Sequence, residues 1–279
     1  EAYDDGGAGA GRTIDAVDGA VAINGEDGLV VTGTHGSGLA IGDAGGIPEG
    51  AGTRMFFNPN KAAFRAGSVT GAEWDNANIG NYSTAMGNTT TASGETSTAM
   101  GYNTTASGYI STAMGTNTTA SGNVSTAMGS VTTASGYIST AMGVSTTASG
   151  YASTAMGSVT TASGNYSTAM GHSTSAPSAF EIAIGRYNTS YTPASTTTWN
   201  SADRLFVIGN GTGLGAESDA MVILKNGNVG IGTSSPSARL DVEGVLELSN
   251  VIPSDPGSDI VRLGDGGENL HIQTNFGYV

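Results

Sequence analysis

The chain has 279 residues, of which 45 are glycine and none is cysteine, so disulfide bonds and zinc–thiolate sites are excluded. Its formal net charge is −14, and its nine Lys and Arg residues are scattered, which argues against binding to nucleic acid or an anionic membrane. No apolar run approaches the roughly 18 residues that span a bilayer, so membrane insertion is not expected.

Residues 1–67 are predicted to form an acidic, Gly-rich N-terminal arm and a small β-rich cap. The first 12 residues cannot bury enough apolar surface to fold alone, so a neighbouring subunit is expected to hold them. Residues 13–23 and 28–32 alternate in polarity and are separated by hairpin-type turns. Segments 55–57 and 63–65 contain three Phe and predict an aromatic cap.

A 14-residue repeat dominates residues 68–192. Its unit reads S-T-A-M-G-x-x-T-T-A-S-G-x-x, and residues 70–190 are expected to hold about eight turns of it. Helix-pair repeats are longer, whereas this length suits two short strands and two turns. The repeat predicts an all-β fold, a parallel β-roll (a β-solenoid) of 14-residue coils about 4.8 Å apart.

Residues 193–279 are predicted to form a β-rich stalk or connector. Asn226 and Gly227 mark a tight turn between two strands. Strands are expected in segments 204–208, 221–225 and 228–231, and segments 239–244 and 245–248 alternate again. Almost no helix is expected anywhere in the chain.

Strand alternation assigns each repeat position to the inside or the outside of a coil. Ser97, Ala99 and Gly101 share one face of the first strand, opposite Thr98 and Met100. Only small side chains fit inside so narrow a roll, so the Ser, Ala and Gly face is expected to point inward. The inward residues of the second strand are then Thr104, Ala106 and Gly108.

The methionines then form an outward column, and an apolar column on a soluble protein indicates an interface. Burying one Met contributes about 1.5–3 kcal/mol, so seven contribute roughly 10–20 kcal/mol before entropy costs. We predict an intertwined homotrimer whose interface contains Met86, Met100, Met114, Met128, Met142, Met156, Met170 and Ile184. The alternative is a monomer with Met in its core and the small residues outside.

The repeat resembles the head domains of trimeric autotransporter adhesins, which carry S-x-A-x-G and A-x-G motifs. Ser97, Ala99 and Gly101 fit the first motif, and Ala106 and Gly108 fit the second. The resemblance implies a left-handed parallel β-roll with the Thr and Met positions facing a trimer axis. The flanks resemble bacterial surface proteins and phage tail fibres in segments 63–67, 74–80, 224–233 and 235–242.

No catalytic site and no cofactor are expected. The three histidines, His35, His172 and His271, lack metal-ligand spacing. The Gly-rich segment 209–213 lacks the Lys and the following helix of a phosphate-binding loop. Calcium binding at the acidic pairs Asp4–Asp5 and Glu26–Asp27 is left open, although no known calcium-loop pattern is present.

Tyrosine recurs in the turns that follow Thr-Ala-Ser-Gly or its equivalent, and stacked turns would align these rings along one edge. The expected ridge, with carbohydrate or a host surface protein as its ligand, contains Tyr82, Tyr109, Tyr137, Tyr151 and Tyr166. Tyr102 lies in the other turn, on the opposite edge. The alternative is that these rings only pack on neighbouring coils.

These patterns predict a non-catalytic structural subunit of an extracellular or cell-surface fibre of the adhesin type. Residues 13–23 could add as a strand to an exposed sheet edge, so trimers are expected to join head to tail through the N-terminal arm. One alternative is a receptor-binding segment of a phage tail fibre. Another is a solenoid enzyme acting on polysaccharide, which needs clustered carboxylates; residues 80–178 contain one acid, Glu95.

Overall fold

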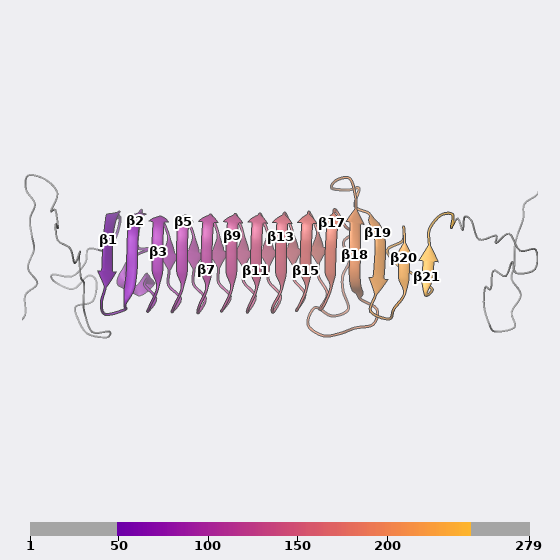
Figure 1. Cartoon of the computed structure of the whole chain (residues 1–279), viewed down its shortest axis with the longest axis horizontal. Coiled ribbons are helices and arrows are strands. Elements are labelled where there is room, and N and C mark those ends of the chain that lie inside the picture. The colour runs from indigo at the N-terminus through magenta and orange to yellow at the C-terminus, as the bar shows by residue number, and fades with distance from the viewer. Residues whose placement is uncertain (1–48, 247–279) are drawn as a thin grey trace, which may run out of the picture. The chain divides into compact units, whose positions relative to one another are not determined.

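A computed structural model describes residues 49–246, and those up to Glu243 belong to one compact unit (Figure 1). The predicted N-terminal arm, its strands at 13–23 and 28–32, and both acidic pairs lie outside the described residues. Among the described residues the fold is all-β, and one short 3-10 helix, Asn76–Asn78, is its helical element. This confirms the predicted fold class.

Each 14-residue unit forms one long and one short strand, and the units stack as two parallel sheets. Met114 of one coil pairs with Met128 of the next, and Thr119 pairs with Thr133. The eight long strands are β3 (Thr84–Asn88), β5 (Thr98–Tyr102), β7 (Thr112–Thr116), β9 (Thr126–Ser130), β11 (Thr140–Val144), β13 (Thr154–Ser158), β15 (Thr168–His172) and β17 (Ile182–Arg186). They match the eight expected turns.

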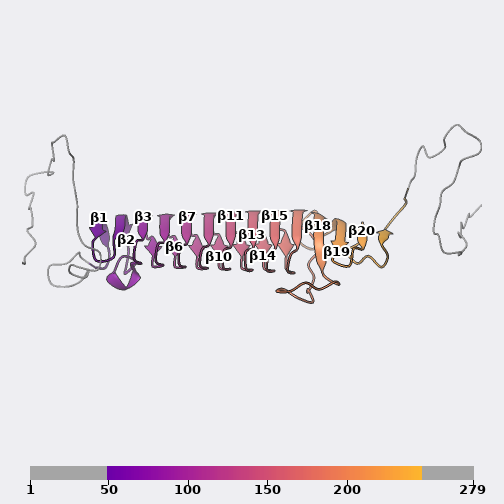
Figure 2. The ribbon, with the colours of Figure 1, turned by 60° about the horizontal axis from the view of Figure 1, so that its bottom comes forward.

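The short strands form a second layer, which Figure 2 shows beneath the long strands. They are β4 (Thr91–Ala92), β6 (Thr105–Ala106), β8 (Thr119–Ala120), β10 (Thr133–Ala134), β12 (Thr147–Ala148), β14 (Thr161–Ala162) and β16 (Ser175–Ala176). Thr at most of these positions suits a strand. A glycine follows every short strand except β16, because a Cβ there would meet the backbone of the next coil, as at Gly94, where it would lie 2.0 Å from the Gly108 oxygen.

The sheet of long strands continues beyond the repeats at both ends. At the N-terminal end an antiparallel hairpin of β1 (Gly52–Asn58) and β2 (Ala63–Val69) pairs with β3. At the C-terminal end it is extended by β18 (Arg204–Asn210), β19 (Asp219–Leu224), β20 (Val229–Ile231) and β21 (Leu240–Val242). The sheet of long strands continues across both predicted domain boundaries, between residues 67 and 68 and between residues 192 and 193. The division into three folding units therefore stays a prediction.

The core of each coil consists of small side chains. Ser97, Ala99, Thr104 and Ala106 are at most 1% exposed, and their counterparts are buried in every repeat. The expected inward position of Gly101 is wrong, because its backbone turns to a φ of +122° and leaves it exposed at the strand end. A Cβ there would lie 2.0 Å from the carbonyl oxygen of Gly115, so the coil spacing requires glycine.

Large side chains close the N-terminal end of this narrow core. Trp74 is fully buried, and its indole nitrogen donates to the carbonyl oxygen of Thr90 at 2.8 Å. Arg65 lies in register with Ala85, and its guanidinium donates to the backbone and hydroxyl oxygens of Ser83. Burial lowers the pKa of Arg65 to about 10. These contacts provide donors for the carbonyl oxygens of Thr90 and Ser83 at the N-terminal end of the described coils, while Arg65 Nε has no partner.

The two turns of each coil contain residues in the left-handed backbone region, and many of them are not glycine. Val124 and Val131 both have a φ of 57°. Such a conformation costs a branched side chain roughly 1–2 kcal/mol. It is offset because each turn amide bonds to the preceding coil, as the Val131 amide does to the Thr116 carbonyl at 2.9 Å. The same geometry projects the turn side chains outward along both edges of the stack.

Candidate functional site

The methionines form one continuous column on the outer face of the long-strand sheet. Each Met pairs in register with the next, and the column ends in Ile184 beside Ile208 of β18. Met86, Met128 and Met170 are 36–43% exposed, whereas the Ala residues that precede them are fully buried. The chain therefore places its methionines outside and its small residues inside, and the arrangement with a Met core is not observed. Whether this face is a trimer interface stays a prediction.

We call the outer face of the long strands, with its column of methionines and Ile184, the Met face. Ile208 of β18 extends this face, and it is not among the interface residues predicted from the sequence. It follows Ile184 by 24 positions instead of 14, because residues 187–203 form an inserted loop between β17 and β18. A sequence signal is present, since Val207-Ile208-Gly209 resembles the motif Ala183-Ile184-Gly185. A search at fixed spacing misses it.

Three of the five predicted ridge tyrosines lie in contact at the turns between short and long strands. The Tyr137 and Tyr151 rings are stacked with centroids 5.4 Å apart, and Tyr151 meets Tyr166 edge-on at 5.3 Å. Phe180 stacks on Tyr166 at 5.0 Å, and Trp199 from the inserted loop follows at 6.1 Å. We call these five residues the aromatic ridge.

The other tyrosines lie elsewhere along the stack. Tyr109 is separated from Tyr137 by the coil that carries Asn123 and Val124, and Tyr82 lies further towards the N-terminal end. Tyr102 ends β5 on the opposite edge and is 55% exposed. The sequence did not identify Phe180 or Trp199. The position of Phe180 in the repeat was a signal for it, but no spacing predicts Trp199.

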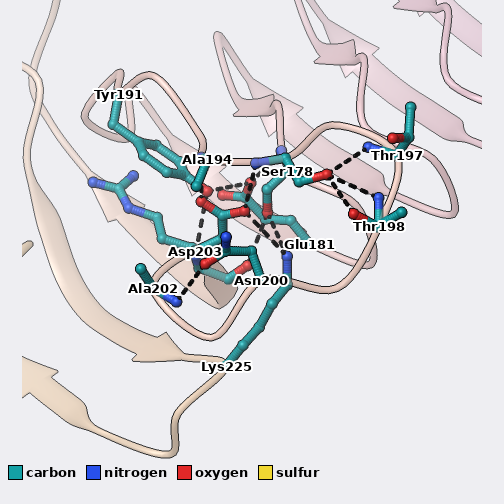
Figure 3. Close-up of polar contacts among 12 residues, drawn as sticks. Ser178, Glu181, Tyr191, Ala194, Thr197, Thr198, Asn200, Ala202, Asp203 and Lys225 are labelled. Atoms are coloured by element: carbon teal, nitrogen blue, oxygen red, sulfur yellow. Dashed lines mark hydrogen bonds and ion pairs between the residues drawn. The ribbon is translucent and has the colours of Figure 1, made fainter.

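A buried polar cluster closes the C-terminal end of the solenoid (Figure 3). Glu181 takes the place of the repeated core serine and is fully buried. Its Oε2 accepts hydrogen bonds from the Ser178 amide at 2.9 Å and the Tyr191 hydroxyl at 3.1 Å, while Oε1 has no partner. Burial raises the pKa of Glu181 to about 7, although these hydrogen bonds and Arg204 oppose the shift.

The same cluster brings a serine hydroxyl to a lysine amine, a pairing that serves as a nucleophile and base in some hydrolases. The Ser178 hydroxyl lies 3.0 Å from Lys225 Nζ, and burial lowers the Lys225 pKa. Ser178 is 0% exposed and donates to the Arg204 carbonyl at 3.0 Å, so no substrate reaches its oxygen. Asp203 lies 4.0 Å from Lys225. The cluster is therefore a structural plug.

A pocket of about 410 Å³ lies beside this plug, and hydroxyl groups, Tyr191 and Arg204 line much of it. The donors of Arg204 are already engaged, because its guanidinium bonds to Thr189 and lies 3.2 Å from Asp219. The described residues contain no group of three His, Cys, Asp or Glu arranged to hold a metal ion. The absence of a cofactor stays a prediction.

Two further segments named in the sequence analysis take ordinary structural roles. The Gly-rich segment 209–213 leaves the end of β18 and enters a turn closed by the bridge between Gly213 and Ala216. His172 makes a side-chain contact with the Tyr187 hydroxyl at 3.1 Å. Neither forms part of a ligand cluster in the described region.

Because burial raises the pKa of Glu181 from 4.5 to about 7, its folded state holds more protons than the unfolded chain between these pH values. Stability is therefore expected to fall as the pH rises from 4.5 to 7, by on the order of 3 kcal/mol from this group. Glu181→Gln should remove that fall. Denaturant unfolding of both proteins from pH 4 to 8 measures it, and parallel curves would contradict the assignment.

The stacked strands, the small core and the regular turns define a class of protein, the parallel β-solenoid built from 14-residue coils. Within it, residues 79–104, 106–132, 134–160, 148–174 and 162–188 match the YadA head domain repeat. The repeat region of this chain is therefore similar to the repeats of YadA-type heads, which belong to trimeric autotransporter adhesins. Comparison with curated proteins gave no match.

YadA head repeats indicate an adhesin-type surface protein, and the family is of a non-enzymatic kind. Among residues 49–246, no helix has the length and apolar character needed to cross a membrane.

Proposed function

We propose that this chain is a structural subunit of an extracellular adhesin-type fibre, assembled as a homotrimer through its Met face. The observation that carries the proposal is the unbroken column of in-register methionines on a sheet whose other face is already packed. Ala, Ser and Thr fill the inside of each coil, so the Met column is left as a continuous apolar surface for association.

The proposed threefold arrangement would use the same sheet. Each chain has one long-strand face, with Met in one column and the half-buried Thr of the same strands in the next. Three such faces around one axis would bury every Met column against its neighbours without leaving a free edge, a closed symmetry. The match to YadA head repeats supports this arrangement, because heads of that kind are trimeric.

The proposed fibre is non-catalytic. Residues 96–180 contain no Asp, Glu, Lys or Arg, so this part of the solenoid has no pair of carboxylates for glycan hydrolysis. At its C-terminal end, Arg204 pairs with Asp219, and Lys225 lies 4.0 Å from Asp203. A regular, charge-poor stack of coils suits a spacer that holds a binding surface away from its attachment point.

We further propose that trimers join head to tail through residues 1–23. A strand added to the open edge of an end coil would satisfy unpaired main-chain groups and propagate as a filament. The wild-type chain is expected to show a trimer mass by light scattering and filaments by electron microscopy. Deletion of residues 1–23 should leave folded trimers that form no filaments.

The same experiment tests the trimer and the head-to-tail joining separately. A monomeric wild-type mass contradicts the trimer. Filaments that persist unchanged after the deletion contradict the role of the arm and leave the trimer in place. Circular dichroism of the deletion variant provides the control for folding.

A further inference from the structure

We propose that the aromatic ridge binds a neutral, unbranched, β-linked glycan along the length of the solenoid. The ridge consists of Tyr137, Tyr151, Tyr166, Phe180 and Trp199. This proposal rests on the surface role proposed above, since it supplies a ligand for that surface. It uses the turn edge of the solenoid and not the Met face.

The geometry of the rings leaves part of each one available. The parallel pairs have centroids 5.4 Å and 5.0 Å apart, at interplanar angles of 16° and 7°. Stacked planes approach to about 3.5–4 Å, so rings at these separations are offset and overlap only in part. The five side chains are 38–55% exposed. An exposed apolar stripe of this kind on a surface protein marks a binding site.

The spacing of the ridge favours a linear polymer with a short repeat. Three tyrosines and Phe180 come from four successive coils, and the coils are about 4.8 Å apart. The repeat of an extended β-linked hexopyranose chain is similar to this rise. Successive sugars can therefore lie against the edges and the uncovered parts of successive rings while their hydroxyl groups remain in contact with water.

The charge around the ridge distinguishes between charged and neutral ligands. Residues 96–180 contain no Asp, Glu, Lys or Arg, and the Lys225 amine 5.7 Å from the Trp199 ring is buried, so the ridge offers little charge to a charged peptide or a sulfated or carboxylated glycan. The whole chain is acidic and repels polyanions at long range. A neutral glycan meets neither obstacle.

The inserted loop supplies hydrogen-bonding groups at one end of the ridge. Its carbonyl groups at Ser195 and Thr196 accept bonds from the amides of Ala179 and Asn165, which hold the loop against the last coils. Trp199 is 55% exposed, and Thr196, Thr197 and Thr198 beside it are also exposed. An exposed indole next to several hydroxyl groups matches the two kinds of contact that a sugar makes.

Affinity electrophoresis of the full chain tests this proposal with hydroxyethyl cellulose in the gel. Carboxymethyl cellulose is the matched probe, since it has the same backbone and carries charge. The wild type should be retarded by the neutral polymer and much less by the charged one. The variant Tyr151→Asn, Tyr166→Thr and Trp199→Ser should weaken retardation roughly tenfold or more.

The substitutions at 151 and 166 use residues that the chain itself has at those repeat positions, Asn123 and Thr96, so the fold should persist. Tyr102→Thr on the opposite edge is the control and should retain wild-type retardation. The proposal is overturned if the neutral polymer does not retard the wild type, if both polymers retard it equally, or if the ridge variant binds normally.

A change in the molecular mass of the ridge variant would also overturn it, because the ridge would then be a contact between copies of the chain. A failure to bind glycan while the wild-type trimer mass is retained would leave the structural role intact. A monomeric wild type that still binds the neutral polymer would contradict the proposed trimer and leave the glycan site in place.

Discussion

Replacing both Met114 and Met128 by Asp is expected to dissociate the trimer, and to unfold the chain if the coils depend on it. A trimer would then hold six carboxylates near one axis, two from each chain. Removing a carboxylate from water without a partner costs several kcal/mol, and like charges in adjacent coils add repulsion. Light scattering measures the mass, and circular dichroism measures the melting temperature.

A matched control places the same two charges on the same two coils, on the other sheet. Thr119 and Thr133 are in-register neighbours on the outer face of the short strands, and both are partly exposed. Thr119→Asp with Thr133→Asp should keep the trimer mass and lower the melting temperature only slightly, because water solvates the new carboxylates. The proposed interface is wrong if the Met variant keeps the wild-type mass and stability.

The fold was predictable because one pattern is repeated without a gap. A residue at any position of the unit pairs with the same residue 14 positions later, so a single decision about which face is inside settled the core of every coil. Ala and Ser lie inside because they are small, whereas a narrow coil has no room for Met. Gly101 was misplaced because its backbone leaves the strand alternation on which the face argument depends.

The features that the sequence did not predict lie where the repeat stops. Arg65 replaces a core alanine and Glu181 a core serine, and only three-dimensional contacts show that each side chain plugs an end of the core. Ile208 was missed because an inserted loop changes the spacing. Trp199 reaches the aromatic ridge through that loop, whose path depends on the carboxylate of Asp203 that accepts the Ala194 and Ser195 amides.

Gly122→Ala is expected to destabilise the chain by at least about 3 kcal/mol, a large effect for one methyl group. A Cβ on Gly122 would lie 2.0 Å from the carbonyl oxygen of Gly136 and 2.7 Å from its carbonyl carbon. The obstacle is backbone of the next coil, so no side chain can rotate away. Separating the coils would break the hydrogen bonds between them at that level.

Gly213→Ala provides the control, because a Cβ there meets no atom within 4 Å. It should shift the denaturant midpoint little. Gly129→Ala should be worse than Gly122→Ala, since its Cβ would lie 2.0 Å from the Gly143 oxygen and its φ of +122° adds backbone strain. Because each coil contacts only its neighbours, the damage should start locally, with new proteolytic cleavage near the substituted coil. Equal midpoints for Gly122→Ala and Gly213→Ala would contradict the coil spacing on which the Met face and the aromatic ridge both depend.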